Sequence, residues 1–307
     1  MSGSTIRDSW KAPLLSLLVF ALFISVWGWL TRPQVQRVAD MTPQQIEYAQ
    51  LMGKLPEDPA QLAMIIEAGD GLEGSLPVRA AGGFPTPAET AAAFVRQLRD
   101  PFRDNGPNDQ GIAWQLGASL WRVGAGFGLA VLVALPLGFL IGMSPLASRA
   151  INPFIQVLKP ISPLAWMPIA LFTIKDASAS AIFVIFICSI WPMLVNTAFG
   201  VAHVRREWLN VARTLEVGVW RRIVHVILPA AAPTILTGMR ISMGIAWLVI
   251  VAAEMLVGGT GIGYFVWNEW NNFALANVIF AIVVIGVVGM ALDTLFARAQ
   301  KAVTYVE

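Results

Sequence analysis

The chain has 307 residues, of which 56% are hydrophobic and only 13% are charged. Soluble domains carry about 25% charged residues, so this chain has too little charge to solvate a surface of its size. The formal net charge of +2 is small, which excludes a nucleic-acid binder that relies on phosphate contacts. Composition therefore favours a protein whose surface faces the lipid bilayer.

The first apolar stretch, Pro13–Leu30, approaches the length of about 20 apolar residues that a membrane helix needs. A cleaved signal peptide is the competing interpretation. No small-x-small cleavage site follows the stretch, and Trp27-Gly28-Trp29 is typical of an anchor at the membrane interface. We expect residues 1–30 to form an N-terminal segment with an uncleaved first transmembrane helix.

The next segment, residues 31–110, is polar, rich in proline and glycine, and more acidic than basic. Its periodicity predicts short helices around Pro43–Met52, Pro59–Ala68 and Pro87–Asp100. We expect residues 31–112 to form a periplasmic insert with amphipathic helices.

Five further stretches are long and apolar enough to cross a bilayer. They are Ser119–Met143, Asn152–Thr173, Ser178–Gly200, Thr234–Val257 and Asn277–Phe296. With the first stretch, they predict an all-α integral membrane fold of six transmembrane helices. The second of the five contains four prolines, which remove backbone donors and clash with the preceding turn, so we expect that span to be broken or tilted.

The charges near the helix ends predict the orientation of the spans. The loop from Ala202 to Leu228 carries five arginines against two glutamates, and an excess of basic residues marks cytoplasmic loops. Six spans then place both termini in the cytoplasm and the acidic insert outside. In this scheme Arg149 and Lys159 belong to the second internal loop.

The same cytoplasmic loop has the pattern of a docking helix. Glu207 to Leu215 can form a short helix in which Trp208, Val211, Ala212 and Leu215 share one face. A short amphipathic helix outside the membrane suits a groove on a partner protein, and Arg213 and Arg221 can steer docking. The alternative is an ordinary loop helix packed on its own bundle.

This loop resembles the coupling loop of ABC importer permeases, whose pattern is Glu-Ala-Ala, three residues, Gly, nine residues, Ile, one residue and Leu-Pro. Ala212, Val226, Leu228 and Pro229 are in register, whereas Asn210, Val211 and Glu216 depart from the pattern. The similarity to this superfamily extends from about Gln110 to Arg298. It is carried by the segments Ser119–Gly128, Leu135–Gly138, Pro160–Pro168, Gly238–Gly244, Trp247–Leu256 and Gly259–Gly263.

The resemblance implies a type I ABC importer permease core at residues 113–298, with a coupling loop at 202–229 and a cytoplasmic tail at 299–307. It implies a multi-pass protein of the bacterial inner (plasma) membrane. Within the nitrate, bicarbonate and sulfonate/taurine branch, four segments look most like nitrate permeases: Asp100–Phe102, Gly106–Gly111, Ala246–Leu256 and Gly263–Trp267. The cargo expected from the resemblance is a small inorganic oxyanion, which is nitrate and, as a second cargo, nitrite. Bicarbonate, cyanate and sulfonate/taurine are the alternative cargoes.

The resemblance also implies the partners. They are a second copy of the chain, two ABC ATPase subunits and an external solute-binding protein. The chain has no phosphate-binding Gly-x-x-x-x-Gly-Lys-Ser/Thr loop, so we expect ATP and Mg to be held by the partner ATPases and this chain to bind no cofactor and to have no catalytic residue. The residues expected to couple to the ATPases are Glu207, Trp208, Asn210, Val211, Ala212, Arg213, Leu215 and Glu216.

Two other function classes remain as alternatives. An ATPase-independent anion channel or secondary transporter would not need the coupling loop. An intramembrane enzyme would need a cluster of catalytic side chains, which the sequence does not indicate. The two histidines, His203 and His225, are too few and too far from other ligands to suggest a metal site.

Charges inside the spans are costly and usually face protein or water. Arg122, Arg240, Glu254 and Asp293 are of this kind. In the structural interpretation, these side chains form ion pairs or extend (snorkel) to the membrane interface. In the functional interpretation, the arginines provide a positive field that attracts a planar oxyanion. We expect Arg240 and Asp293 to pair, because the fifth and sixth spans are antiparallel neighbours. The candidates for the translocation path are Arg122, Arg240 and the neutral donors Trp191, Asn196 and Thr197.

Overall fold

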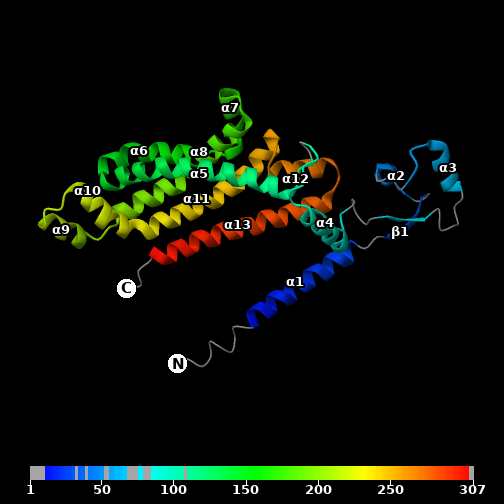
Figure 1. The fold of residues 1–307 in the computed structure, drawn as a ribbon, viewed down its shortest axis with the longest axis horizontal. Helices are drawn as coiled ribbons and strands as arrows, with labels where there is room; N and C mark the ends of the chain where they lie inside the picture. Colours follow the sequence, from blue (N-terminus) through cyan, green and yellow to red (C-terminus); the bar gives the residue numbers. More distant parts are fainter. Residues whose placement is uncertain are drawn as a thin grey trace. The chain divides into compact units, whose positions relative to one another are not determined.

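The computed structural model describes residues 11–31, 34–38, 41–51, 55–67, 75–78, 84–106 and 109–303. It divides into two compact units, residues 1–94 and 95–307, and the division falls within helix α4 (Pro87–Arg99). Five of the described helices are long and apolar enough to cross a membrane, or six if one sharply bent pair is a single span. The predicted all-α membrane fold with six spans is thus confirmed, with one small sheet added (Figure 1).

The first unit begins with the apolar helix α1 (Lys11–Leu30), whose membrane-length window is 0% buried. The indole Nε1 of Trp27 donates a hydrogen bond to the carbonyl of Pro85 (3.0 Å), and its ring packs edge-on against Phe84. Helix α4 begins immediately afterwards with a capping box, in which Thr86 and Glu89 satisfy each other's backbone N–H groups. The end of α1 is therefore tied to the start of α4.

The insert has its own small core. Helices α2 (Pro43–Leu51) and α3 (Pro59–Glu67) match two of the predicted short helices, and α4 matches the third. Strands β1 (Gln34–Arg37) and β2 (Ser75–Val78) pair antiparallel, which the sequence did not indicate. Four buried apolar side chains form the core: Val38, Met41, Ala49 and Leu55.

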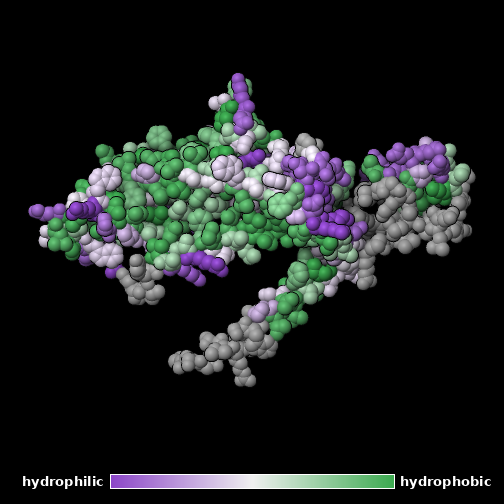
Figure 2. All heavy atoms as spheres, in the orientation of Figure 1, coloured by the Kyte–Doolittle hydropathy of each residue, from purple (hydrophilic) through white to green (hydrophobic). Residues whose placement is uncertain are grey.

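Three long helices form the centre of the second unit: α5 (Ile112–Met143), α8 (Ala177–Ala202) and α11 (Leu228–Val257). Helix α13 (Leu275–Val303) packs against α11. Figure 2 shows hydrophobic atoms over this bundle and hydrophilic atoms gathered toward its ends. Exposed apolar side chains on α13, such as Ile282, Val287 and Met290, fit a surface that faces lipid.

Glycines allow α5 and α8 to approach closely, and this predicts a matched pair of variants. A Cβ at Gly126 would lie 2.7 Å from the side chain of Ile185, whereas a Cβ at Gly124 would meet nothing within 4 Å. We expect Gly126→Ala to destabilise the bundle by about 1–3 kcal/mol through overpacking. Gly124→Ala should leave the thermal midpoint of the detergent-purified protein unchanged. Equal midpoints for the two variants would contradict this packing.

The predicted proline-broken span consists of two helices, α6 (Pro145–Leu158) and α7 (Pro163–Ile174), which meet at a 93° bend. Lys159 lies in the break between them and not in an internal loop. The expectation that Arg149 and Lys159 share a loop between two spans is wrong, because only Ser144 separates α5 from α6 and Arg149 lies within α6.

The loop between α8 and α11, which the sequence predicts to be cytoplasmic, contains helix α9 (Arg206–Thr214) and a short helix α10 (Val219–Arg222). A π-helical turn η3 (Ile223–Ile227) follows and continues into α11. The helix expected over Glu207–Leu215 ends at Thr214. A further helix that the sequence did not indicate, α12 (Ile262–Asn271), follows α11 before α13 begins.

Candidate functional site

Helix α9 is fixed to the bundle by its inner side. Ala212 is only 4% exposed, and Leu209 packs against a buried cluster that joins the ends of α8 and α11. The cluster consists of Val201, Val204, Ile227, Ala231 and Ile235. A displacement of α9 therefore acts directly on the ends of two core helices.

The outer side of α9 is apolar and open. Trp208, Val211 and Leu215 are 44%, 59% and 70% exposed. Val219 and Trp220 of α10, 56% and 80% exposed, extend the apolar surface along the chain. We call these five residues the coupling surface.

The face expected from the sequence is thus divided, since Ala212 points inward and the other three side chains stay open. The Arg205 guanidinium lies 5.4 Å from the Trp208 ring, and the nearby Arg206 and Arg213 are exposed. An apolar helix surface with basic residues around it is suited to an acidic-rimmed groove on a partner.

Glu216 stands where the coupling-loop pattern has glycine. The backbone conformation at this position explains why the pattern favours glycine there. The φ of Glu216 is +51°, in the left-handed region that favours glycine. The Val217 N–H bonds to the Ala212 carbonyl (2.9 Å) and the Glu216 N–H to the Arg213 carbonyl (3.0 Å), which is a Schellman ending of α9. The turn is kept although the glycine is not.

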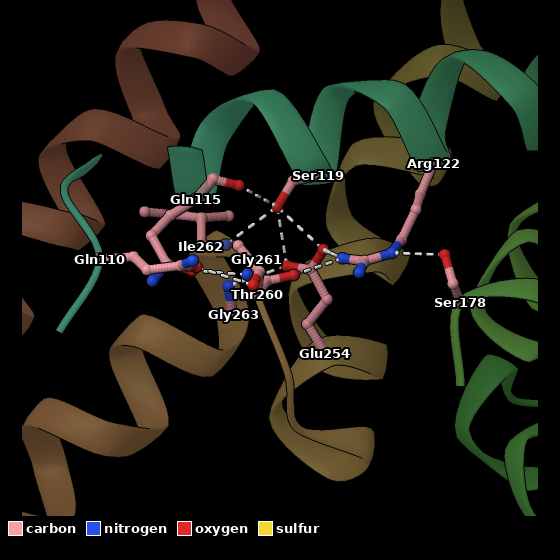
Figure 3. A network of polar contacts seen from close by, with 10 residues as sticks. All are labelled: Gln110, Gln115, Ser119, Arg122, Ser178, Glu254, Thr260, Gly261, Ile262 and Gly263. Atoms are coloured by element: carbon pink, nitrogen blue, oxygen red, sulfur yellow. Dashed lines mark hydrogen bonds and ion pairs between the residues drawn. The ribbon is translucent and has the colours of Figure 1, made fainter. Parts of the chain in front are cut away.

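A buried polar network lies at the opposite end of the bundle, around Glu254 of α11 (Figure 3). Glu254 is 2% exposed, and one of its carboxylate oxygens accepts a hydrogen bond from Nη1 of Arg122 (2.7 Å). Nη1 of Arg122 also donates to the Thr260 carbonyl (2.6 Å), and Nε of Arg122 donates to the Ser178 hydroxyl (3.0 Å). Arg122 is therefore held by protein groups on three elements.

The other side of the network satisfies the start of α12. Backbone N–H groups of Gly261, Ile262 and Gly263 donate to Gln115 (2.5 Å), Ser119 (2.9 Å) and Glu254 (3.0 Å), respectively. Such N–H groups have no partner within their own helix, and a carboxylate is favoured at a helix N-terminus. The network thus joins α5, α11 and α12 at this end.

The glycine-rich loop after α11 is required by this geometry. Gly258 and Gly259 have φ values of +77° and +89°. A Cβ on Gly261 would collide with the Glu254 carboxylate, and one on Gly263 would collide with the Val251 carbonyl. The glycines therefore allow the backbone to wrap around the carboxylate.

Two candidates for the translocation path pack inside the bundle. Thr197 is fully buried against Gly138 of α5, and its hydroxyl has no partner among the described residues. Asn196 contacts Gly238 of α11 and donates its amide to the Pro192 carbonyl (2.8 Å). Both side chains serve the contacts of α8 with its neighbours.

The third neutral candidate, Trp191, lines a pocket of about 260 Å³ beside the break between α6 and α7. The other lining residues are Lys159, Pro160, Ile161, Ser162, Pro163, Trp166, Ile187, Cys188, Pro192 and Ile245. This pocket combines a cation, a hydroxyl and two indole rings. Sequence reasoning did not connect Lys159 with Trp191, although Lys159 is the only charged residue in the predicted span Asn152–Thr173.

The structure brings Arg240 and Asp293 together. Nε and Nη2 of the guanidinium lie 2.5 and 2.6 Å from the two carboxylate oxygens, a bidentate pair between α11 and α13. The two side chains are 39% and 53% exposed. Both arginines considered for the translocation path, Arg122 and Arg240, thus have carboxylate partners.

A pair of variants tests whether this ion pair serves assembly. We expect Asp293→Ala to lower the yield of assembled protein more than the double variant Arg240→Ala/Asp293→Ala, because the single change leaves an arginine without its partner. The measurement is the amount of monodisperse protein after detergent extraction. An additive double variant would show that the two residues act independently.

A bundle of apolar spans that carries an anchored, charge-flanked helix on one loop fits the membrane-spanning subunit of a transport system. Residues 134–304 match the family described as the binding-protein-dependent transport system inner membrane component, and the chain belongs to this family. It is therefore a multi-pass permease subunit of the inner membrane, and ATP hydrolysis belongs to separate subunits.

Three permease proteins are similar in sequence to this chain over most of its length. The nitrate import permease protein NrtB of Synechocystis sp. is 43% identical over 223 residues, which cover 73% of this chain and 81% of that protein. NrtB of Leptolyngbya laminosa is 46% identical over 196 residues, 64% of this chain and 70% of that protein. The bicarbonate transport system permease protein CmpB of Synechocystis sp. is 42% identical over 207 residues, 67% of this chain and 74% of that protein.

The fold is also that of a solved transporter. An inward-facing structure of the MetNI methionine ABC transporter aligns with a TM-score of 0.56 at 13% identity, over 63% of this chain and 96% of that one. This likeness shows the type I importer fold and nothing about cargo.

Proposed function

We propose that this chain forms the membrane path of an ATP-driven importer for a small inorganic oxyanion, with nitrate as its cargo. The observation that carries the proposal is the 43% identity to a nitrate import permease over 73% of the chain. The anchored coupling surface supports it, because an ATP-driven permease must receive force from ATPases outside the membrane.

Bicarbonate is the second candidate cargo, favoured by the 42% identity to a bicarbonate permease. Nitrate and bicarbonate are both planar, singly charged oxyanions. A translocation path that makes few strong contacts therefore suits either anion. We place nitrate first because the relatives with the higher identities, 43% and 46%, are nitrate permeases.

We further propose the assembly in which the chain works. Two copies form a homodimer, each copy docks one ABC ATPase through its coupling surface, and an external solute-binding protein delivers the anion. ATP and Mg are bound by the ATPases. Closure of the ATPases would move the two α9 helices, and the contact of Leu209 with the cluster at the ends of α8 and α11 would pass that movement to both helices.

Reconstitution tests the cargo. The permease, its ATPases and its binding protein are placed in proteoliposomes loaded with ATP, and uptake of ¹⁵N-nitrate is compared with uptake of ¹⁴C-bicarbonate. We expect ATP-dependent uptake of nitrate and little of bicarbonate. Uptake of bicarbonate alone would replace nitrate as the cargo, and uptake without ATP would refute the importer itself.

The proposed orientation, with both termini in the cytoplasm, predicts opposite labelling of two sites. We replace Cys188, the only cysteine, by alanine and introduce single cysteines at Ser75 in the insert or at Val219 beside the coupling surface. An impermeant thiol reagent added to intact spheroplasts should label Ser75→Cys and not Val219→Cys. Labelling of both from the same side would contradict the six-span topology.

A further inference from the structure

The pocket beside the break of the α6–α7 span holds a charge at an unusual depth. Its wall includes Cys188 and Trp191, near the middle of the 26-residue helix α8, and Ile245, near the middle of the 30-residue helix α11. At about 1.5 Å per residue these helices are roughly 39 and 45 Å long, whereas the hydrocarbon layer is about 30 Å thick. Lys159 therefore lines a pocket at the level of the bilayer centre.

The ammonium group of Lys159 has no carboxylate partner there. The other four intramembrane charges form two pairs, Arg122 with Glu254 and Arg240 with Asp293, but no acidic residue lines this pocket. Within the described residues Lys159 takes part in no ion pair. A cation at this depth is expensive unless it faces water, protein or a ligand, and such residues mark the routes of ions through membranes.

The chemistry around Lys159 fits a small anion. Ser162, the residue that precedes α7, also lines the pocket, and its hydroxyl carries an O–H donor. The start of the 12-residue helix α7 directs its positive end toward the same space. Trp166 and Trp191 add two indole rings, whose N–H groups are donors and whose faces exclude water.

The break in the span is what makes this site possible. A straight helix would satisfy its own N–H groups, whereas Pro160 and Pro163 interrupt the helix, and both Lys159 and Ser162 of the break line the pocket. Irregular backbone at this depth is tolerated where it is packed in protein or lines a water-filled cavity. The volume of about 260 Å³ accommodates a planar anion of four atoms together with water.

We infer that Lys159 is the anion-contacting residue of the translocation path, with Ser162, Trp166 and Trp191 completing a site for a small planar oxyanion. This inference rests on the proposed function, since it assumes that the cargo is an anion. One lysine with neutral donors binds weakly enough to release the ion, and transport requires release as well as binding. Arg122 and Arg240, whose charges are compensated, then serve the structure.

The test compares Lys159→Gln with Lys159→Arg in the complete transporter, in proteoliposomes that contain ATP. Lys175→Gln is the matched control, because Lys175 lies in the exposed turn between α7 and α8 and does not line the pocket. We expect Lys159→Gln to reduce ¹⁵N-nitrate uptake at least about tenfold, as the loss of a charge-assisted contact implies. Lys159→Arg should keep most of the uptake, and Lys175→Gln should match the wild type.

The native Cys188 gives a second readout that does not need transport, since it lines the same pocket. Sodium nitrate should slow its modification by a small methanethiosulfonate reagent in the wild type but not in Lys159→Gln. Wild-type nitrate uptake that Lys159→Gln leaves intact would overturn the inference. So would loss of the copurifying ATPases in Lys159→Gln, which would assign Lys159 to assembly. Absence of nitrate uptake by the wild type would instead refute the proposed cargo, and protection of Cys188 by bicarbonate would then support the site alone.

Discussion

Glu254→Ala is expected to leave little assembled permease in the membrane. The change removes the carboxylate partner of Arg122, whose side chain is only 14% exposed, and leaves the Gly263 N–H without an acceptor. Breaking a buried ion pair by removing one partner costs about 3–5 kcal/mol, a large fraction of the stability of a typical protein. The measurement is the thermal midpoint and yield of the detergent-purified protein.

Two further variants separate charge from shape in this network. Glu254→Gln keeps the size of the side chain and should lie between the wild type and Glu254→Ala. The double variant Arg122→Leu/Glu254→Leu removes both charges and should be more stable than Glu254→Ala. If the double variant is the least stable of the three, the stranded arginine is not the source of the damage.

Ala212→Glu is expected to abolish uptake while the permease stays in the membrane. Ala212 is 4% exposed on the inner side of α9, so a longer, charged side chain must push the helix away from the bundle. The coupling surface would then be displaced from the helices that it has to move. Uptake in proteoliposomes should fall to background, whereas ATP hydrolysis by the copurified ATPases should continue.

Ala212→Ser is the matched control, because a hydroxyl adds one atom and leaves the helix in place. Leu215→Asp attacks the same function from the other side, since Leu215 is 70% exposed and its change alters the surface without forcing α9 outward. We expect Leu215→Asp to weaken binding of the ATPases. Normal uptake by Ala212→Glu would exclude α9 as the coupling element.

The elements themselves could be predicted from the sequence where one physical signal dominates. Apolar stretches above the length of a bilayer crossing identified the long spans to within a few residues at most ends, and the prolines in Asn152–Thr173 indicated the break. The short insert helices begin at Pro43, Pro59 and Pro87, each at the first helical position where proline is tolerated.

The contacts between elements could not be predicted in the same way. Arg122 and Glu254 are 132 residues apart, and their pairing depends on how α5 packs against α11. Periodicity placed Ala212 and Val211 on one face of α9, but only the packed bundle decides that Ala212 is covered and Val211 is open. Lys159 was assigned to an internal loop because basic residues mark such loops, whereas its actual position depends on where the chain turns.

Helix α11 connects the cluster beneath α9, the Lys159 pocket and the Glu254 network in one continuous element. It starts at the cluster beneath α9, passes the Lys159 pocket near its middle with Ile245, and ends with Glu254. Because the residues of a helix move as one body, a tilt about the midpoint displaces its two ends in opposite directions. For a helix of about 45 Å, a tilt of about 10° moves each end by about 4 Å. A single tilt of α11 would then narrow the translocation path on one side of the Lys159 pocket and widen it on the other. The bound anion would lie at the pivot of this tilt.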